Sequence, residues 1–216
     1  MPNKTVVVSC VLALLSFAAP ALAGPPFICH PFEIGTTRSL PWTAGDWLGL
    51  RSDYAITRVV ADTEALLTPA MPTLARMETL RRAVLYASGD RAVAKQLLAA
   101  LIVRARAAAH PDRLGALALF DAGYAIEAMS EIEQLGHHMS DLADRGRALA
   151  GLTGSLDGRS LLQRSAALRA DDAAIAFALA LISETPDKGP HLAKARAGAT
   201  QDRLLASNMA KLQMLP

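Results

Sequence analysis

The order of apolar and polar positions divides the chain into three parts. A mostly apolar run, Thr5 to Phe17, lies near the N-terminus. Proline and glycine punctuate residues 24–51, so neither the strand nor the helix period survives there, and we predict an irregular arm. From residue 52 onward apolar residues recur at helical spacing among alanine, leucine and arginine, and no alternating Val/Ile/Thr run favours a strand. This pattern predicts residues 52–216 as a single all-helical domain.

Apolar stripes and stop signals place the individual helices. One stripe runs from Leu74 to Leu85 and ends at Ser88-Gly89, after which Asp90 can cap the next helix. That helix ends at His110-Pro111, because the residue before a proline avoids the helical region. The stretch AAIAFALALI (173–182) is nearly apolar all round, so we expect it in the middle of the core. The expected helices are about 53–67, 74–88, 91–109, 114–136, 140–149, 159–169, 172–184, 190–198 and 201–213.

This run of helices predicts the fold class. Helices joined by short turns pack as antiparallel neighbours. We therefore expect an all-α protein, with antiparallel helical hairpins stacked as a short solenoid or packed as an irregular bundle. The arm of residues 24–51 carries four aromatic residues, which would let it dock on the helices: Phe27, Phe32, Trp42 and Trp47.

Residues 1–23 have the layout of a secretory signal peptide. Lys4 precedes the apolar run, Pro20 breaks it, and Ala21-Leu22-Ala23 offers the small residues that favour cleavage before Gly24. The alternative is an uncleaved anchor, since the segment is only just long enough to span a bilayer. We expect cleavage, a periplasmic or secreted protein, and no stable membrane span once the signal is removed.

Cysteine usage and charge narrow the chemistry further. The chain holds two cysteines, Cys10 in the expected signal and Cys29, so the exported protein has no internal disulfide. The 22 basic and 20 acidic residues give a net charge of +2, without a long basic run or a basic face. Because phosphate binding needs clustered lysine and arginine, we expect no nucleic-acid partner.

The pair Cys29-His30 is the first candidate for chemistry. A thiolate and an imidazole can ligate a metal, and a thiol near a base can act as a nucleophile. Pro26 stands where c-type haem attachment would need a second cysteine, and no other histidine has ligand spacing with Cys29. We predict no metal and no cofactor. The interpretation that we favour is a small buried cysteine, with a metal ligand or a reactive or intermolecularly bonded thiol as the alternatives.

Three further residues are candidates for a binding site. Asp121 lies on an apolar stripe between Leu117 and Tyr124, where a carboxylate needs a partner or its pKa rises. We expect a structural ion pair with an arginine of a neighbouring helix; the alternative is a polar group that lines a cleft. Trp42 and Trp47 flank TAGD, and we expect them to anchor the arm between helices, or alternatively to stack on a ligand. The arginines available to Asp121 are Arg76, Arg81, Arg82, Arg104 and Arg106.

Two stretches resemble known proteins. The sequence SLLQRSAALRADDAAIAFALALIS (160–183) resembles a junction between tetratricopeptide repeats, with Ala167-Leu168 ending one helix, Asp171-Asp172 turning, and Ala173 beginning an alanine-rich helix. That resemblance implies a concave surface that binds protein or peptide partners, and it implies no chemistry. The stretch FICHPFEIG with the later SLPW resembles uncharacterised exported bacterial proteins, which implies export.

The standard catalytic signatures are absent from the sequence. TGSLDG (153–158) is not a nucleophile elbow, and no P-loop, H-E-x-x-H or calcium-loop pattern occurs. We name no catalytic residue, and our first hypothesis is an exported, non-catalytic protein-interaction or scaffold module. The alternative hypothesis is an exported enzyme or small-ligand-binding helical protein, with a site where the arm meets the helices near Cys29, His30 and Asp121.

Overall fold

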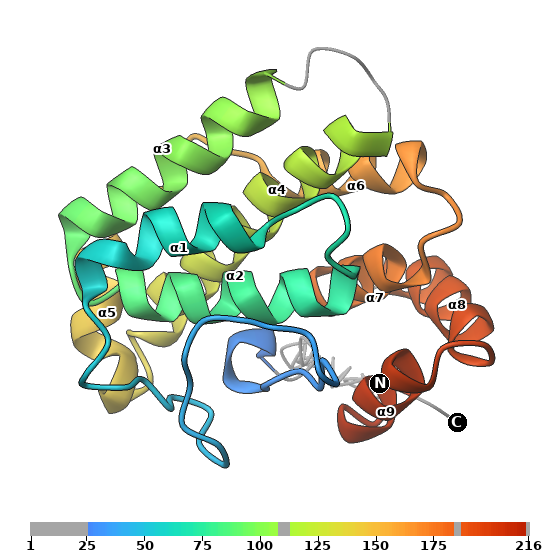
Figure 1. Ribbon diagram of the computed structural model, residues 1–216, viewed down its shortest axis with the longest axis horizontal. Helices are drawn as coiled ribbons and strands as arrows, with labels where there is room; N and C mark the ends of the chain where they lie inside the picture. Colours follow the sequence, from blue (N-terminus) through green and yellow to red (C-terminus); the bar gives the residue numbers. More distant parts are fainter. Residues whose placement is uncertain (1–25, 108–112, 184–186, 215–216) are drawn as a thin grey trace, which may run out of the picture.

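The computed structural model describes residues 26–107, 113–183 and 187–214, and the structural statements below refer to these residues (Figure 1). Within them the chain forms nine α-helices and three short 3-10 helices, and no strand, which confirms the all-α fold class. The expected signal peptide, Cys10 and the helix end at His110-Pro111 lie outside the described residues.

The helices follow the expected order, with two local differences. The helix expected from residue 53 begins later, because residues 51–55 form a turn and the 3-10 helix Ile56–Arg58 precedes α1. Ser140 does not cap a helix through its side chain; it opens the 3-10 helix Ser140–Leu142, which leads into α5. The bounds are α1 Val59–Leu66, α2 Thr73–Ala87, α3 Arg91–Ala107, α4 Arg113–Leu135, α5 Ala143–Leu149, α6 Gly158–Leu168, α7 Ala173–Ile182, α8 Lys188–Ala199 and α9 Arg203–Lys211.

Aspartates fix the starts of several helices. Asp90 accepts a hydrogen bond from the Ala92 amide at 2.7 Å, as the sequence predicts. Asp172 and Asp202 cap α7 and α9 in the same way, each through one carboxylate oxygen. Such side chains satisfy the amides that a helix start leaves without a partner inside the helix. The polar turns of this chain therefore set where its apolar helices begin.

Helix α4 is the centre of the bundle and contacts α2, α3, α5, α6 and α7 (Figure 1). Its approach to α6 is close, because a Cβ atom on Gly123 would lie 2.7 Å from the Gly158 carbonyl oxygen. In a solenoid each repeat contacts only its neighbours, whereas one helix here contacts five others. We describe the fold as a bundle, and the solenoid detail of the prediction is not confirmed.

The core contains α7, as its composition predicts. Every residue from Ala174 to Leu181 is buried, and Phe177 is wholly inaccessible. Leu114 departs from the expectation. It continues the apolar stripe of α4 in sequence, yet 59% of its surface is exposed. It lies in the first turn of α4, beyond the level at which neighbouring helices cover the stripe.

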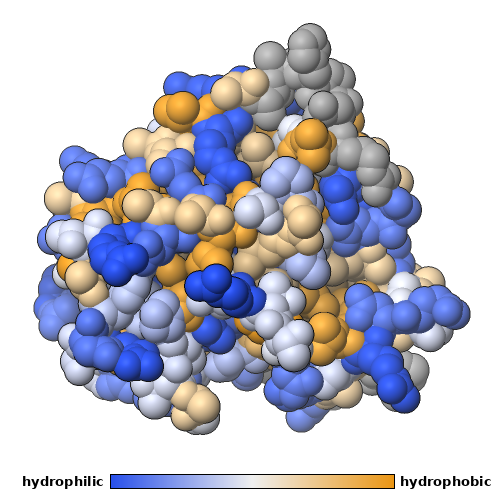
Figure 2. All heavy atoms as spheres, in the orientation of Figure 1, coloured by the Kyte–Doolittle hydropathy of each residue, from blue (hydrophilic) through white to orange (hydrophobic). Residues whose placement is uncertain are grey.

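The segment of residues 26–55 is irregular apart from the 3-10 helix Phe27–Cys29. It contains the described part of the expected arm, 24–51, and continues for four residues beyond it, and from here on the arm means this segment. In Figure 1 it runs beneath α2 and then turns back toward α1, with α9 beside it. Hydrophilic and hydrophobic residues intermingle over this face of the molecule (Figure 2). No helix in the described part of the chain is long and apolar enough to cross a membrane.

Candidate functional site

The backbone of the arm is bound by charged side chains of the helices. Glu131 of α4 accepts hydrogen bonds from the amides of Phe27 and Ile28, at 3.2 and 2.8 Å. Arg81 of α2 donates one hydrogen bond to the Ile28 carbonyl and another, at 2.9 Å, to the Trp47 carbonyl. An irregular segment pairs only some of its own backbone groups, so those that are buried need partners from elsewhere. These side chains allow the arm to lie against the core without secondary structure.

Glu78, Arg81 and Arg82 of α2 form the centre of this binding. Glu78 and Arg81 are inaccessible to solvent and meet in a two-pronged ion pair, with contacts of 2.8 and 2.9 Å. Glu78 also accepts from the Phe32 amide and from Arg82, while Arg82 donates to the Leu40 carbonyl at 2.6 Å. A buried carboxylate is stable when its lone pairs are filled, and here four donors fill them. Together with the two bonds of Arg81, the cluster holds the arm backbone at four points: Ile28, Phe32, Leu40 and Trp47.

Aromatic contacts anchor the same segment. The Trp42 ring packs edge-on against Tyr86 at 5.9 Å, and the guanidinium of Arg81 lies 4.8 Å from the Trp42 ring centroid. Trp42 also donates from its indole nitrogen to the Asp46 carbonyl, across a turn in which Gly45 adopts a φ of +84°. Phe32 meets Phe177 of the core at 6.0 Å. Trp42 thus serves as an anchor of the arm.

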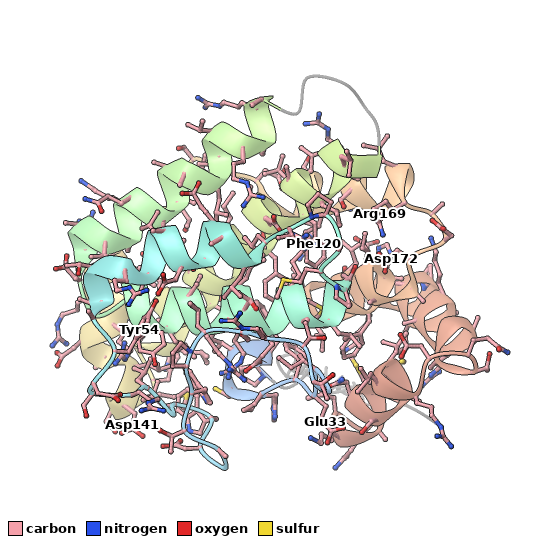
Figure 3. All side chains as sticks on the ribbon, viewed as in Figure 1. Glu33, Tyr54, Phe120, Asp141, Arg169 and Asp172 are labelled. Atoms are coloured by element: carbon pink, nitrogen blue, oxygen red, sulfur yellow. The ribbon has the colours of Figure 1, made fainter. Side chains whose placement is uncertain are left out.

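The arm also binds α9, through Glu33. Asn208 accepts a hydrogen bond from the Glu33 amide at 2.8 Å and donates one to the Glu33 carbonyl at 2.9 Å. Its side-chain amide therefore pairs with the Glu33 backbone as a peptide group of a neighbouring segment would. The Glu33 carboxylate pairs with Lys211 at 2.6 Å and accepts from Ser207. Figure 3 shows Glu33 beside this C-terminal helix. The arm is thus bound to α9 as well as to α2 and α4.

A groove opens between the arm, α2 and α9, and we call it the arm groove. Its volume is about 640 Å³. It brings together His30, Trp42 and Trp47, three of the five candidate residues, and it does not include Cys29 or Asp121. The remaining lining residues are Pro31, Phe32, Glu33, Ala44, Gly45, Asp46, Arg82, Asn208, Lys211 and Leu212.

The charges at the arm groove are matched by the protein itself. Lys211 pairs with Glu33, Arg82 pairs with Glu78, and Asp46 accepts a hydrogen bond from the Leu48 amide. Burial lowers the pKa of His30, and the positive charge of Arg81 adds to that effect. His30 is therefore neutral at pH 7. The groove therefore presents the indole rings of Trp42 and Trp47 and the ring of Pro31, and its basic and acidic side chains balance one another.

Cys29 packs against the core beside this groove and is partly exposed. Burial, followed by the nearby Glu131 carboxylate, raises the pKa of its thiol to about 11. Because the thiolate is the nucleophile and the metal ligand, such a thiol is poorly suited to either role. No cluster of three or more histidine, cysteine or acidic residues that could hold a metal occurs among the described residues.

Asp121 lies inside the bundle, away from the arm groove. It accepts two hydrogen bonds from Arg76, at 2.9 and 2.7 Å, and both side chains are almost completely buried. Arg104 approaches the same carboxylate at 3.9 Å. Burial raises the pKa of Asp121 to about 6, against the opposing effect of Arg76. The arrangement is the structural ion pair between helices that the sequence suggests, with Arg76 as the partner.

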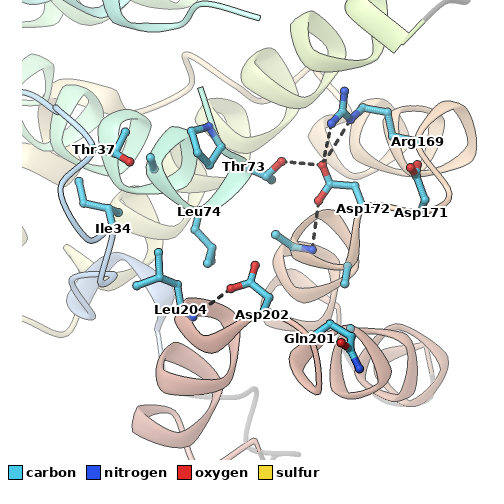
Figure 4. Close-up of a pocket in the computed structure, with 15 residues that line it drawn as sticks. Ile34, Thr37, Thr73, Leu74, Arg169, Asp171, Asp172, Gln201, Asp202 and Leu204 are labelled. Atoms are coloured by element: carbon cyan, nitrogen blue, oxygen red, sulfur yellow. Dashed lines mark hydrogen bonds and ion pairs between the residues drawn. The ribbon is translucent and has the colours of Figure 1, made fainter. Parts of the chain in front are cut away.

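A second pocket of about 520 Å³ lies where α2, α7 and α9 meet the arm (Figure 4). Two of its carboxylates, Asp172 and Asp202, serve local structure. Asp172 accepts from Thr73 at 2.7 Å and from Arg169 while it caps α7, and Asp202 caps α9. Figure 3 places Arg169 and Asp172 together at the turn between α6 and α7. We assign this pocket to helix capping rather than to ligand binding.

Sequence reasoning missed the side chains that bind the arm. Glu78 follows Leu74 by four residues and precedes Arg81 by three, so its place on a helical face with an ion-pair partner was visible. Glu131 follows Tyr124 by seven residues on the buried stripe, which marks it as a carboxylate in need of donors. What the sequence does not give is the identity of the donors, since Glu131 and Phe27 are 104 residues apart.

Comparisons with known proteins leave the structure as the basis for any functional conclusion. The chain matches no known family, no curated protein and no solved structure.

Proposed function

We propose that the protein is an exported, non-catalytic interaction module that binds an extended peptide segment of a partner protein in the arm groove. The observation that carries the proposal is the construction of that groove. One wall is an irregular segment whose backbone is held by buried side chains, and the other is α9. A wall fixed in this way is preorganised, so a ligand loses little free energy in ordering it.

The surface of the groove favours an apolar, uncharged peptide segment. Trp42 and Trp47 supply large rigid surfaces that pack on aliphatic or proline side chains, as in other aromatic-lined peptide grooves. Glu33, Asp46, Arg82 and Lys211 already have partners within the protein, so a charged ligand would have to compete with them. A volume of about 640 Å³ suits a few residues of such a segment.

A binding role is also favoured over a catalytic one at this place. The thiol of Cys29 is weakly acidic, and Asp121 is engaged by Arg76 elsewhere in the bundle. General acid–base or nucleophilic chemistry needs a nucleophile and a base within hydrogen-bond reach of one another. His30 borders the groove, but no nucleophile with a hydrogen bond to it is found in the described part of the chain.

Export and the repeat resemblance belong to this proposal on sequence grounds. The signal-like residues 1–23 support delivery to the periplasm or the medium, where a partner would be an envelope or secreted protein. The tetratricopeptide-like stretch lies on α6 and α7, which pack in succession with α8. That order of antiparallel helices suits an interaction module.

Site-specific photo-crosslinking in the envelope of the source organism tests the proposal. A photoreactive amino acid at Ala44, which is exposed in the groove, should yield a discrete protein adduct. The same amino acid at Lys95, which is exposed on α3, is the matched control and should yield none.

The variant Trp47→Ala should abolish the adduct formed at position 44. Equal labelling from positions 44 and 95, or an adduct that survives Trp47→Ala in a folded protein, would contradict peptide binding in the arm groove. Recovery of the whole chain, with residues 1–23, from the cytoplasm would contradict export and leave the groove to be tested separately.

A further inference from the structure

A third pocket lies between α3, α4 and α6 and has no lining residue from the arm; we call it the α4 groove. Its floor is Leu119 and Ile126 of α4, and its walls come from α3 and α6, which both pack on α4 (Figure 1). Its volume is about 540 Å³, and it shares no lining residue with the arm groove. The remaining lining residues are Ile102, Ala105, Arg106, Ser155, Leu156, Asp157, Ser160, Leu161 and Arg164.

Two arginines lie at one end of this groove, on opposite walls. Ser165 of α6 donates to the Ala116 carbonyl, which places the adjacent Arg164 level with the early turns of α4. Arg106 is one residue from the end of α3, the end from which the chain leads into α4. Both side chains are exposed, and neither has a hydrogen-bond or ion-pair partner among the described residues.

The floor of the groove is apolar along its length, whereas its walls also carry polar side chains. Leu119 and Ile126 are seven residues apart on α4, a distance of about 10 Å along the helix axis. Ile102, Leu156 and Leu161 line the sides, and the loop of residues 155–157 closes the far end. The carboxylate of Asp157 there accepts a hydrogen bond from the Ser160 amide. Positive charge thus lies at one end of the groove, next to an apolar floor.

The shape of the groove favours a thin, extended ligand over the α-helix of a partner protein. The floor is only one helix wide, and Leu119 and Ile126 are 6% and 1% exposed, so they lie deep between the walls. An α-helix with its side chains is about 10 Å across and would rest on the rims of such a groove. The volume falls in the range of about 300–1,000 Å³ that is usual for small-molecule sites.

We propose that the α4 groove binds a medium-chain fatty carboxylate, such as decanoate. The carboxylate lies between Arg106 and Arg164, which can each offer a forked pair of N–H donors. The acyl chain lies over Leu119 and Ile126, where its own apolar surface and that of the partly exposed wall residues are removed from water. This site is separate from peptide binding in the arm groove, and it gives the module a second, amphiphilic ligand.

Isothermal titration calorimetry on the purified protein tests this proposal. Sodium decanoate, below its micelle concentration, should bind with one-to-one stoichiometry. Decyltrimethylammonium has the same tail and the opposite charge, and it should bind about tenfold more weakly or less. Octanoate should bind more weakly than decanoate, because a shorter chain buries less apolar surface.

Three variants locate the binding. The double substitution Arg106→Gln with Arg164→Gln should weaken decanoate binding about tenfold or more, because both charge-assisted contacts are lost. Ala105→Phe fills the groove from its α3 wall and should abolish binding. Arg203→Gln, at an exposed arginine of α9, is the matched control and should bind decanoate as the parent does. Melting curves check that each variant remains folded.

Several results would overturn the proposal. They are the absence of saturable decanoate binding, equal affinity for the cationic amphiphile, and unchanged affinity in the folded double variant. Binding of an acidic amphipathic peptide without binding of decanoate would also overturn it and would assign the groove to a protein partner. None of these results depends on crosslinking at Ala44, so the two proposals fail independently.

Discussion

The arm and α7 both pack against α2, yet they are held in opposite ways. The arm is bound by directional contacts, because Glu78, Arg81 and Glu131 satisfy its backbone. Helix α7 satisfies its own backbone and is held by apolar packing over every residue from Ala174 to Leu181. The comparison teaches that an irregular segment enters a helical core only where the helices supply charged partners. It follows that stability should depend most on hydrogen-bond geometry at the arm, and most on side-chain volume at α7.

The largest expected effect is at Glu78. Glu78→Ala leaves the guanidinium of Arg81 buried without its carboxylate, which should lower the free energy of unfolding by about 3–5 kcal/mol. Glu64→Ala, at an exposed glutamate of α1, is the control and should change it by less than about 0.5 kcal/mol. Urea denaturation measures both. Similar costs at the two positions would show that the arm does not depend on the buried cluster.

A pair of conservative substitutions sharpens the comparison. Arg81→Lys keeps the charge but removes the fork that reaches Glu78 and two arm carbonyls, and it should cost about 2 kcal/mol or more. Ile175→Leu keeps the volume of a buried α7 side chain and should cost less than about 1.5 kcal/mol. The same denaturation series compares them. Equal losses would remove the distinction between directional and apolar binding.

At the contact between α4 and α6, the space between the two helices should decide which side chains are tolerated. Gly123→Ala places a Cβ atom against the Gly158 carbonyl and should cost about 1–3 kcal/mol. Gly154→Ala meets no atom within 4 Å and is the control. Its effect should be within about 0.5 kcal/mol of zero. Thermal melts compare the two variants, and a tolerated Gly123→Ala would mean that the helices are not in close contact.

Glu131 should make stability depend on pH. Burial raises the pKa of Glu131 to about 7 from its ordinary value near 4.5, although the amides of Ile28 and Phe27 oppose the shift. The folded state therefore holds this proton more tightly than the unfolded chain, so stability falls as the pH rises through that interval. We expect a loss of about 3 kcal/mol from this group, since each unit of pKa difference between the folded and unfolded states corresponds to about 1.4 kcal/mol.

The variant Glu131→Gln does not titrate at this position, so the fall in stability across that interval should be smaller. Asp121 contributes with the same sign, because its pKa is also raised, and part of the slope should therefore remain. Denaturation curves at a series of pH values measure the slope. A variant as steep as the parent would show that Glu131 is not buried against the arm.

Cys29 should give the smallest effect. Cys29→Ala removes a partly buried sulfur and should cost about 1 kcal/mol, with binding in the arm groove retained. The thiol, with its pKa raised to about 11, should react slowly with iodoacetamide at neutral pH in the folded protein and rapidly after unfolding. Mass spectrometry follows the reaction. Fast labelling of the folded protein would identify a reactive thiol.

Local patterns predict the helices of this chain well, and long-range partners much less. The apolar run of α7 and the cap at Asp90 are local features, and the sequence reveals them directly. Asp121 was visible as a carboxylate in need of a partner, but choosing Arg76 among five arginines required the packing of α2 on α4. Leu114 shows the converse, since its periodicity indicates burial that the neighbouring helices do not provide.

The candidate site was only partly foreseeable for the same reason. The arm groove lies where the arm meets the helices, and His30, Trp42 and Trp47 line it. The residues that shape it, such as Asn208, come from the opposite end of the chain, 175 residues from Glu33. No local pattern relates positions so far apart, because their contact is set by how the whole bundle packs.

Amide hydrogen exchange of the arm tests the central claim most directly. The amides of Ile28, Phe32 and Glu33 donate to Glu131, Glu78 and Asn208, and no regular secondary structure protects Phe32 or Glu33. We predict that these amides exchange as slowly as those of α2, while the exposed Ala44 amide exchanges rapidly. Exchange of Phe32 and Glu33 at the rate of an unfolded peptide would contradict an arm held by buried side chains.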